Sequence, residues 1–121
     1  ELLTPYGLRS LSNKDRNYIG IYQWNQEERD KAYHNGTVWS WLLGPYITAY
    51  LKIHNYSEKG ISEAKEKIIL NVVHSLRDYG IGTINEIYDG NYPHTSRGCI
   101  SQAWSVAEIT RAYIEDVLNK I

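Results

Sequence analysis

The sequence predicts an all-α domain with long irregular loops, and three observations support that expectation. Residues 37–55, 57–79 and 101–120 carry apolar side chains at a spacing of three or four, which is typical of helices. No segment alternates apolar and polar residues over the length that a strand needs. The chain has 121 residues, enough for one domain with a core of its own.

Residues 1–36 are expected to be irregular, because proline, glycine, asparagine and serine recur along them. Within this segment, the sequence favours only short helical turns, near residues 14–18 and 26–32.

The first predicted helix, residues 37–55, begins at Thr37, a suitable N-cap residue. Apolar and aromatic residues lie on almost every side of it, which indicates burial on most sides. Gly44 and Pro45 fall inside the segment, and a proline there removes a backbone donor and clashes with the preceding turn. We therefore expect a kink or a late start at this point.

The second predicted helix, residues 57–79, is amphipathic with one solvated face, and Gly80 is placed to end it. The third, residues 101–120, has Ser101 as a suitable cap and an apolar stripe that continues to Ile121. An apolar helix followed by an amphipathic one is typical of the inner and outer pair of a helical toroid. Three helices alone would cover the first one poorly, so the sequence favours a piece of something larger.

The composition argues against several classes of protein. The net charge is −1 and no basic stripe is visible, so we expect no nucleic-acid partner. No apolar run reaches the roughly 18 residues of a membrane span. The single cysteine excludes an intrachain disulfide, and no motif has metal-ligand spacing, so we expect no metal and no cofactor. The chain begins at Glu1 and contains no methionine, which we interpret as a sign of a fragment.

The stretch from residue 80 to residue 100 carries the strongest functional signal. A loop this long inside a compact domain is usually functional or disordered, and apolar anchors along it argue against disorder. The chemically able residues in it are Glu86, Asp89, His94, Arg97 and Cys99.

Glu86 is the leading candidate among these residues, although a solvated loop residue is the alternative. Its apolar neighbours suggest partial desolvation, which raises a carboxyl pKa toward the range useful for proton transfer. Asp89 lies in a D-G-N turn sequence, where it is expected to bond its own backbone. Cys99 could be a nucleophile, but its neighbours give no support for that, and a buried thiol is favoured.

The aromatic residues are unusual, because 11 are Tyr, 4 are Trp and none is Phe. Every ring therefore has a polar group, as sugar-binding surfaces favour, although chance or codon bias is the favoured explanation of the composition. Several aromatic residues cluster near helix starts, where they are either core residues or a binding platform. These are Tyr33, Trp39, Trp41, Tyr46 and Trp104.

Four motifs in this order resemble the glycogen-debranching enzymes, specifically the C-terminal part of the amylo-α-1,6-glucosidase domain of the bacterial and archaeal type. They are LLTPYGLRSLS (2–12), AYHNGTVWSWLLGPYI (32–47), the stretch ending in E-I-Y-D-G (82–90) and RGCISQAWSVAEITRA (97–112). One departure is Ser40, where the resemblance leads us to expect a proline.

The resemblance implies that residues 1–121 are the last helices of an (α/α)6 toroid, the N-terminal part of the domain being absent. It implies a cytoplasmic enzyme of glycogen catabolism that needs no cofactor. The enzyme would hydrolyse α-1,6-linked glucose at branch points of glycogen or a related glucan, by an inverting mechanism with one carboxylic acid and one carboxylate base. Glu86 matches the base. The acid is an aspartate that this chain lacks, so the fragment alone should be inactive.

The same motif match gives supporting roles to further residues. Gln102 and Trp104 would position Glu86 or the glucose, and we expect Tyr33, His34 or Trp104 close to Glu86. The residues expected to line the sugar site are Tyr33, His34, Asn35, Gly36, Thr37 and Trp39.

Two other kinds of function stay open at this point. One is a non-catalytic helical module for carbohydrate binding or interaction. The other is a sugar epimerase or isomerase on the same fold, with His34 and His94 as acid and base. The apolar first helix also leads us to expect self-association of the chain.

Overall fold

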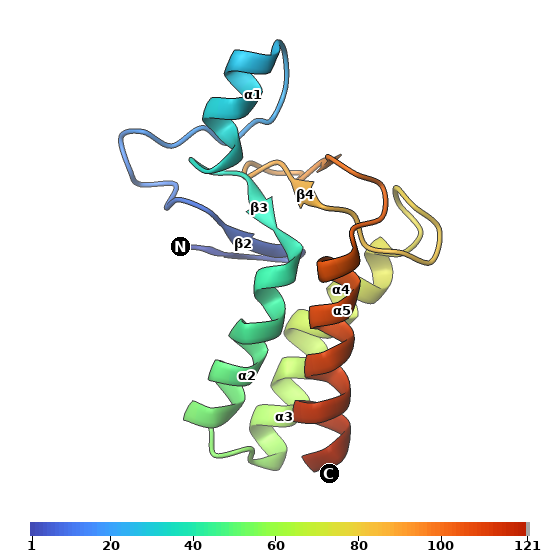
Figure 1. Cartoon of the computed structure of the whole chain (residues 1–121). Helices are drawn as coiled ribbons and strands as arrows, with labels where there is room; N and C mark the ends of the chain where they lie inside the picture. The colour runs from blue at the N-terminus through green and yellow to red at the C-terminus, as the bar shows by residue number, and fades with distance from the viewer. Residues whose placement is uncertain (121) are drawn as a thin grey trace.

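The computed structural model describes residues 1–120 and contains a small antiparallel sheet at one end of a group of helices (Figure 1). The all-α prediction is therefore wrong, and the structure does not support the (α/α)6 toroid. The strands follow one another in the order β1-β2-β3-β4-β5. Their bounds are Leu3–Thr4 (β1), Gly7–Arg9 (β2), Val38–Trp39 (β3), Ile87–Tyr88 (β4) and Ser96–Arg97 (β5).

The length of the strands explains why the sequence pattern does not reveal them. Four of the strands have two residues and β2 has three, so none can show an alternation of apolar and polar side chains. The sheet instead depends on pairing between distant segments. Leu8 pairs with Trp39, and Trp39 pairs in turn with Ile87, which joins three separate parts of the chain.

The helix α1 (Gln26–Tyr33) stands beyond the sheet, where the sequence favours a short turn (Figure 1). The side chain of Asn25 caps it by accepting a hydrogen bond from the Glu28 amide. Thr37 closes the other end, because its hydroxyl donates to the carbonyl oxygen of Ala32 at 2.8 Å. Thr37 is therefore not the N-cap of the next helix.

The helix α2 (Leu43–Ile53) follows β3 after a 3-10 turn at Ser40–Leu42, so the late start expected near Pro45 is confirmed. Pro45 falls in the first turn of α2, where the missing amide costs no helical hydrogen bond.

The second and third predicted helices are confirmed with shorter bounds. The helices α3 (Glu58–Ala64) and α4 (Leu70–Ser75) form one rod through a π turn, capped by Ser57. The rod ends before Gly80, and Gly82, with φ of +74°, makes the turn instead.

The helix α5 (Ala103–Ala112) continues through further turns to Lys120. Gln102 occupies its cap position in place of Ser101, and Ile121 lies outside the described residues.

The core lies between α2, the α3–α4 rod and α5 (Figure 1). Leu43, Ile47 and Leu51 of α2 are at most 1% exposed, so its neighbours cover one face of α2, whereas Ile53 is 79% exposed. Self-association of the chain stays a prediction.

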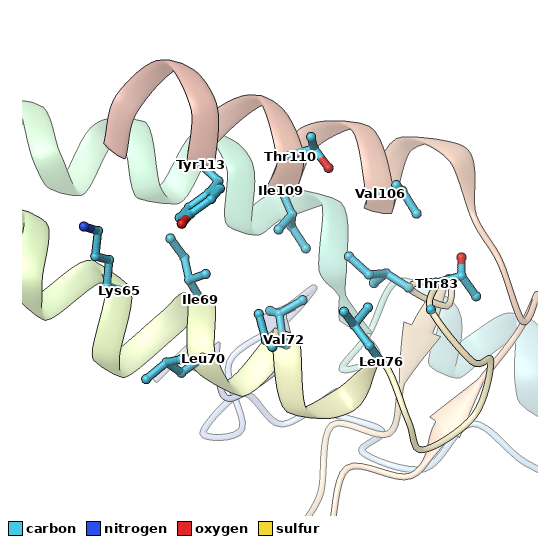
Figure 2. A pocket seen from close by; sticks show the side chains of 13 residues that line it. Lys65, Ile69, Leu70, Val72, Leu76, Thr83, Val106, Ile109, Thr110 and Tyr113 are labelled. Carbon is cyan, nitrogen blue, oxygen red and sulfur yellow. The ribbon is translucent and has the colours of Figure 1, made fainter. Parts of the chain in front are cut away.

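An apolar groove of about 460 Å³ lies between the α3–α4 rod and α5 (Figure 2). Ile69, Val72 and Ile109 are among the side chains that line it. Among residues 1–120, no helix is long and apolar enough to cross a membrane.

Replacing Ile47 with alanine should lower the free energy of unfolding by about 2–5 kcal/mol, because a buried side chain leaves a cavity in a core that relaxes only partly. Ile47 is 1% exposed. Ile53, on the same helix, is 79% exposed and supplies the matched control, with an expected change of at most about 0.5 kcal/mol. Urea unfolding of both variants would measure the difference, and equal losses would show that α2 is not buried as described.

Candidate functional site

Glu86 lies in the bend directly before β4 and is 9% exposed. Its position is fixed by the strand that follows it, since Ile87 pairs with both Trp39 and Arg97. A second tie comes from Cys99, whose carbonyl oxygen accepts the Glu86 amide at 3.0 Å. The Cys99 amide in turn donates to Oε2 of the Glu86 carboxylate at 3.0 Å.

The other carboxylate oxygen, Oε1, accepts a hydrogen bond from the hydroxyl of Tyr33, which lies 53 residues earlier in the chain. Tyr33 is the last residue of α1, so the end of that helix reaches the site. The structure thus brings together Tyr33 and Glu86, as expected from the sequence. The Tyr33 hydroxyl thus serves Oε1 and the Cys99 amide serves Oε2.

The hydrogen bonds decide the ionisation of Glu86. Burial raises the pKa of its carboxyl. The hydrogen bonds from Tyr33 and Cys99 together lower this pKa by more than burial raises it, so the pKa lies below its ordinary value. The expectation that desolvation would raise the pKa is therefore wrong in its net direction. At neutral pH the group is a carboxylate, which can accept a proton but cannot donate one.

The pKa of the Tyr33 hydroxyl is raised, whereas that of Glu86 is lowered. Burial and the hydrogen bond to Glu86 raise the pKa of the Tyr33 hydroxyl, so it stays a donor.

Cys99 is exposed, which makes the expectation of a buried thiol wrong. The neighbouring Glu86 carboxylate raises the pKa of this thiol, first by a hydrogen bond and then by its charge. A thiol held protonated is a poor nucleophile, which argues against the cysteine alternative.

An aromatic cluster adjoins this carboxylate. The Tyr33 and Trp39 rings lie 4.6 Å apart between centroids, and the indole N–H of Trp39 donates to the Tyr33 carbonyl oxygen. The exposed His34 stacks on Trp39 with only 2° between the ring planes. The ring of Trp104, near the start of α5, lies 6.2 Å from the Trp39 ring between centroids. Trp41 stacks on Trp104.

The exposure of Trp104 distinguishes it from a core residue. Its side chain is 47% exposed, whereas Trp39 is 6% exposed. A flat, half-exposed indole is suited to stacking on an apolar surface such as the face of a sugar ring.

Four other predicted site residues form no hydrogen bond with the Glu86 carboxylate in the described part of the chain. Asn35 donates to the Lys31 carbonyl oxygen and Thr37 bonds the end of α1. Gly36, with φ of +148°, lies so close to the Ile19 carbonyl that a side chain would not fit. The Gln102 amide donates to the Ile84 carbonyl oxygen, so its backbone tethers the segment before Glu86. Their contact with sugar stays a prediction.

Asp89 shows what the sequence reasoning missed. It is 2% exposed and forms a 2.9 Å ion pair with Arg97. Within residues 1–120 its carboxylate accepts no hydrogen bond from its own turn, so that expectation is wrong. The Asp89 carboxylate also accepts the Tyr22 amide at 2.7 Å, which ties the N-terminal segment to the site loop. The available signal in the sequence was that Asp89 and Arg97 carry opposite charges eight residues apart in one loop. They can pair only because the turn between β4 and β5 brings them together.

The two histidines of the epimerase alternative belong to different clusters. His34 contacts Tyr33 and Trp39, while His94 bonds the Asp89 carbonyl oxygen and lies edge-on to Tyr6. No aromatic contact or hydrogen bond joins these histidines within residues 1–120. In the same part of the chain, no group of three His, Cys, Asp or Glu side chains could hold a metal ion.

An ionised, oriented carboxylate beside a partly exposed aromatic surface is typical of carbohydrate-processing sites. The chain belongs to the amylo-alpha-1,6-glucosidase family, whose model matches residues 1–111.

A relative from Saccharomyces cerevisiae, described as a glycogen debranching enzyme, is 34% identical over 70 residues. The match covers 52% of this chain and 5% of the yeast protein, so the chain spans a small part of that relative's length. No solved structure matches the chain.

Proposed function

We propose that this chain supplies the general base of a glycogen-debranching enzyme that hydrolyses α-1,6-linked glucose at branch points of glycogen or a related glucan. The family membership supports the substrate class. The observation that carries the mechanism is that Glu86 is buried yet held as a carboxylate by hydrogen bonds from Tyr33 and Cys99.

In the proposed reaction, Glu86 removes a proton from a water molecule as the water attacks the anomeric carbon of the glucose. The bond to the leaving oxygen breaks on the opposite face, where a carboxylic acid must donate a proton. Inverting enzymes hold the two carboxyl groups roughly 6.5–9.5 Å apart so that the water fits. Glu86 cannot perform both tasks in one step, so a second carboxyl group must act as the acid, and the motif resemblance assigns this role to an aspartate outside this chain.

The aromatic cluster would bind the glucose and the adjoining sugars. Trp104 offers a half-exposed indole, while His34 and Trp39 form a stacked pair beside Tyr33. The proposal keeps Asn35, Gly36, Thr37 and Gln102 as lining or tethering residues of this site.

The anomer of the first product tests this proposal. The complete enzyme that carries this chain should release glucose from a limit dextrin, and inversion of an α-linkage should give β-glucose. Proton NMR during the first minutes of reaction would observe the anomer before mutarotation. Release of α-glucose would contradict the inverting mechanism, and binding of dextrin without any hydrolysis would favour the non-catalytic module. The isolated chain should release no glucose.

A further inference from the structure

We propose that Tyr33 is a positioning residue, which holds the Glu86 carboxylate in one orientation and keeps it ready to accept a proton. This inference rests on the proposed function. It gives Tyr33 a task different from lining the sugar site, which is the role implied by the motif resemblance.

The geometry of the carboxylate carries the proposal. The Tyr33 hydroxyl serves Oε1 and the Cys99 amide serves Oε2, so both oxygens of Glu86 are held from different parts of the chain. A carboxylate has about four lone-pair sites, so these bonds leave acceptor capacity for another partner. Because both oxygens are held, the carboxylate is already oriented when a water molecule binds to it.

Tyr33 is itself held firmly enough to act in this way. Its ring packs between Tyr22, at 5.7 Å, and Trp39, at 4.6 Å. Its carbonyl oxygen accepts the Trp39 indole N–H at 3.0 Å, so the backbone is fixed as well as the ring. The hydroxyl therefore approaches Glu86 from a rigid support, which is what orienting a reactive group requires.

The charged and titratable groups on the elements that hold Glu86 come from three parts of the chain. Tyr33 and His34 lie at the end of α1, and Cys99 follows β5. Asp89 and Arg97, at β4 and β5, neutralise each other. Of these groups, Tyr33 and Cys99 bond the carboxylate directly, and only the Tyr33 bond can be removed by deleting a single oxygen atom.

The test is Tyr33→Phe in the complete enzyme, because phenylalanine keeps the ring and removes the hydroxyl. Without that donor the pKa of Glu86 rises, so the carboxylate becomes protonated at a higher pH. The acid limb of the kcat/KM profile should therefore move to higher pH, while activity recovers on the alkaline side. We expect the plateau kcat to fall by at most about 10²-fold, the cost of slight misplacement, and KM for dextrin to stay unchanged.

The chain offers a closely matched control. The Tyr50 hydroxyl donates to Oε2 of Glu63 at 2.5 Å, a tyrosine–glutamate pair on α2 and α3, away from the site. Tyr50→Phe should leave the pH profile unchanged. A Tyr33→Phe enzyme with a raised KM and an unmoved acid limb would overturn the proposal, since it would show that Tyr33 acts by binding sugar.

A measurement independent of activity separates this proposal from the proposed function. Carbon-13 NMR titration of glutamate carboxyls in the 121-residue chain would follow Glu86 directly, with Glu86→Gln identifying its signal. Tyr33→Phe should raise the pKa of Glu86, and an unchanged titration would overturn the positioning role. A raised pKa together with a complete enzyme that lacks glucosidase activity would instead overturn the proposed function alone.

Discussion

Substitution of Glu86 by glutamine in the complete enzyme should lower glucose release from limit dextrin about 10²–10⁴-fold, the usual contribution of a general base. Glutamine keeps the size of the side chain and can still hydrogen-bond to water, but it cannot take a proton. Glucan binding should stay nearly intact, because the aromatic surface is unchanged. The measurement is kcat for glucose release together with the dissociation constant for dextrin.

Glu63→Gln supplies the control for this substitution. Glu63 is also a carboxylate that accepts a tyrosine hydroxyl, and its pKa is likewise lowered, first by that hydrogen bond. It lies on α3, so its replacement should leave kcat unchanged. Near wild-type activity in Glu86→Gln would show that the base is elsewhere, and the mechanism would have to be withdrawn.

Replacement of Asp89 by alanine should lower the free energy of unfolding by about 3 kcal/mol, the low end of the range for breaking a buried ion pair. The low end applies because the Arg97 side chain is 27% exposed and can still reach water. The substitution also leaves the Tyr22 amide without its acceptor, which adds to the loss. Urea unfolding followed by circular dichroism would measure it.

The exposed pair of Lys14 and Glu1 shows what a surface contact contributes by comparison. Their side chains are 74% and 50% exposed, so Lys14→Ala should cost less than about 1 kcal/mol. A double-mutant cycle of Asp89→Ala with Arg97→Ala would isolate the coupling between the pair. A coupling near zero would mean that the pair does not hold the site loop.

The helices were predictable because their signal is local. The caps and apolar spacing of residues 57–79 lie within the segment itself, and Ser57 caps the rod. The start of α2 was harder, because Thr37 satisfies the rules for an N-cap and yet bonds backward to α1. Thr37 instead closes α1 through Ala32, only five residues earlier, and the strand Val38–Trp39 follows it.

The candidate site was predictable only in part. Motif resemblance singled out Glu86 and the residues around Tyr33, but it gave no account of the bonds between them. The net direction of the Glu86 pKa could not be predicted, because desolvation and hydrogen bonding act in opposite senses. Only the positions of the Tyr33 hydroxyl and the Cys99 amide decide which effect is larger.

The sequence by itself determined the helical segments, the family and the choice of Glu86, since these depend on patterns among neighbouring residues. The tertiary structure decided the sheet, the ionised state of Glu86 and the pairing of Asp89 with Arg97. The physical reason is the distance along the sequence between the residues that interact. Two-residue strands and a hydrogen bond between residues 53 apart are stable only after the folded chain has brought their partners together.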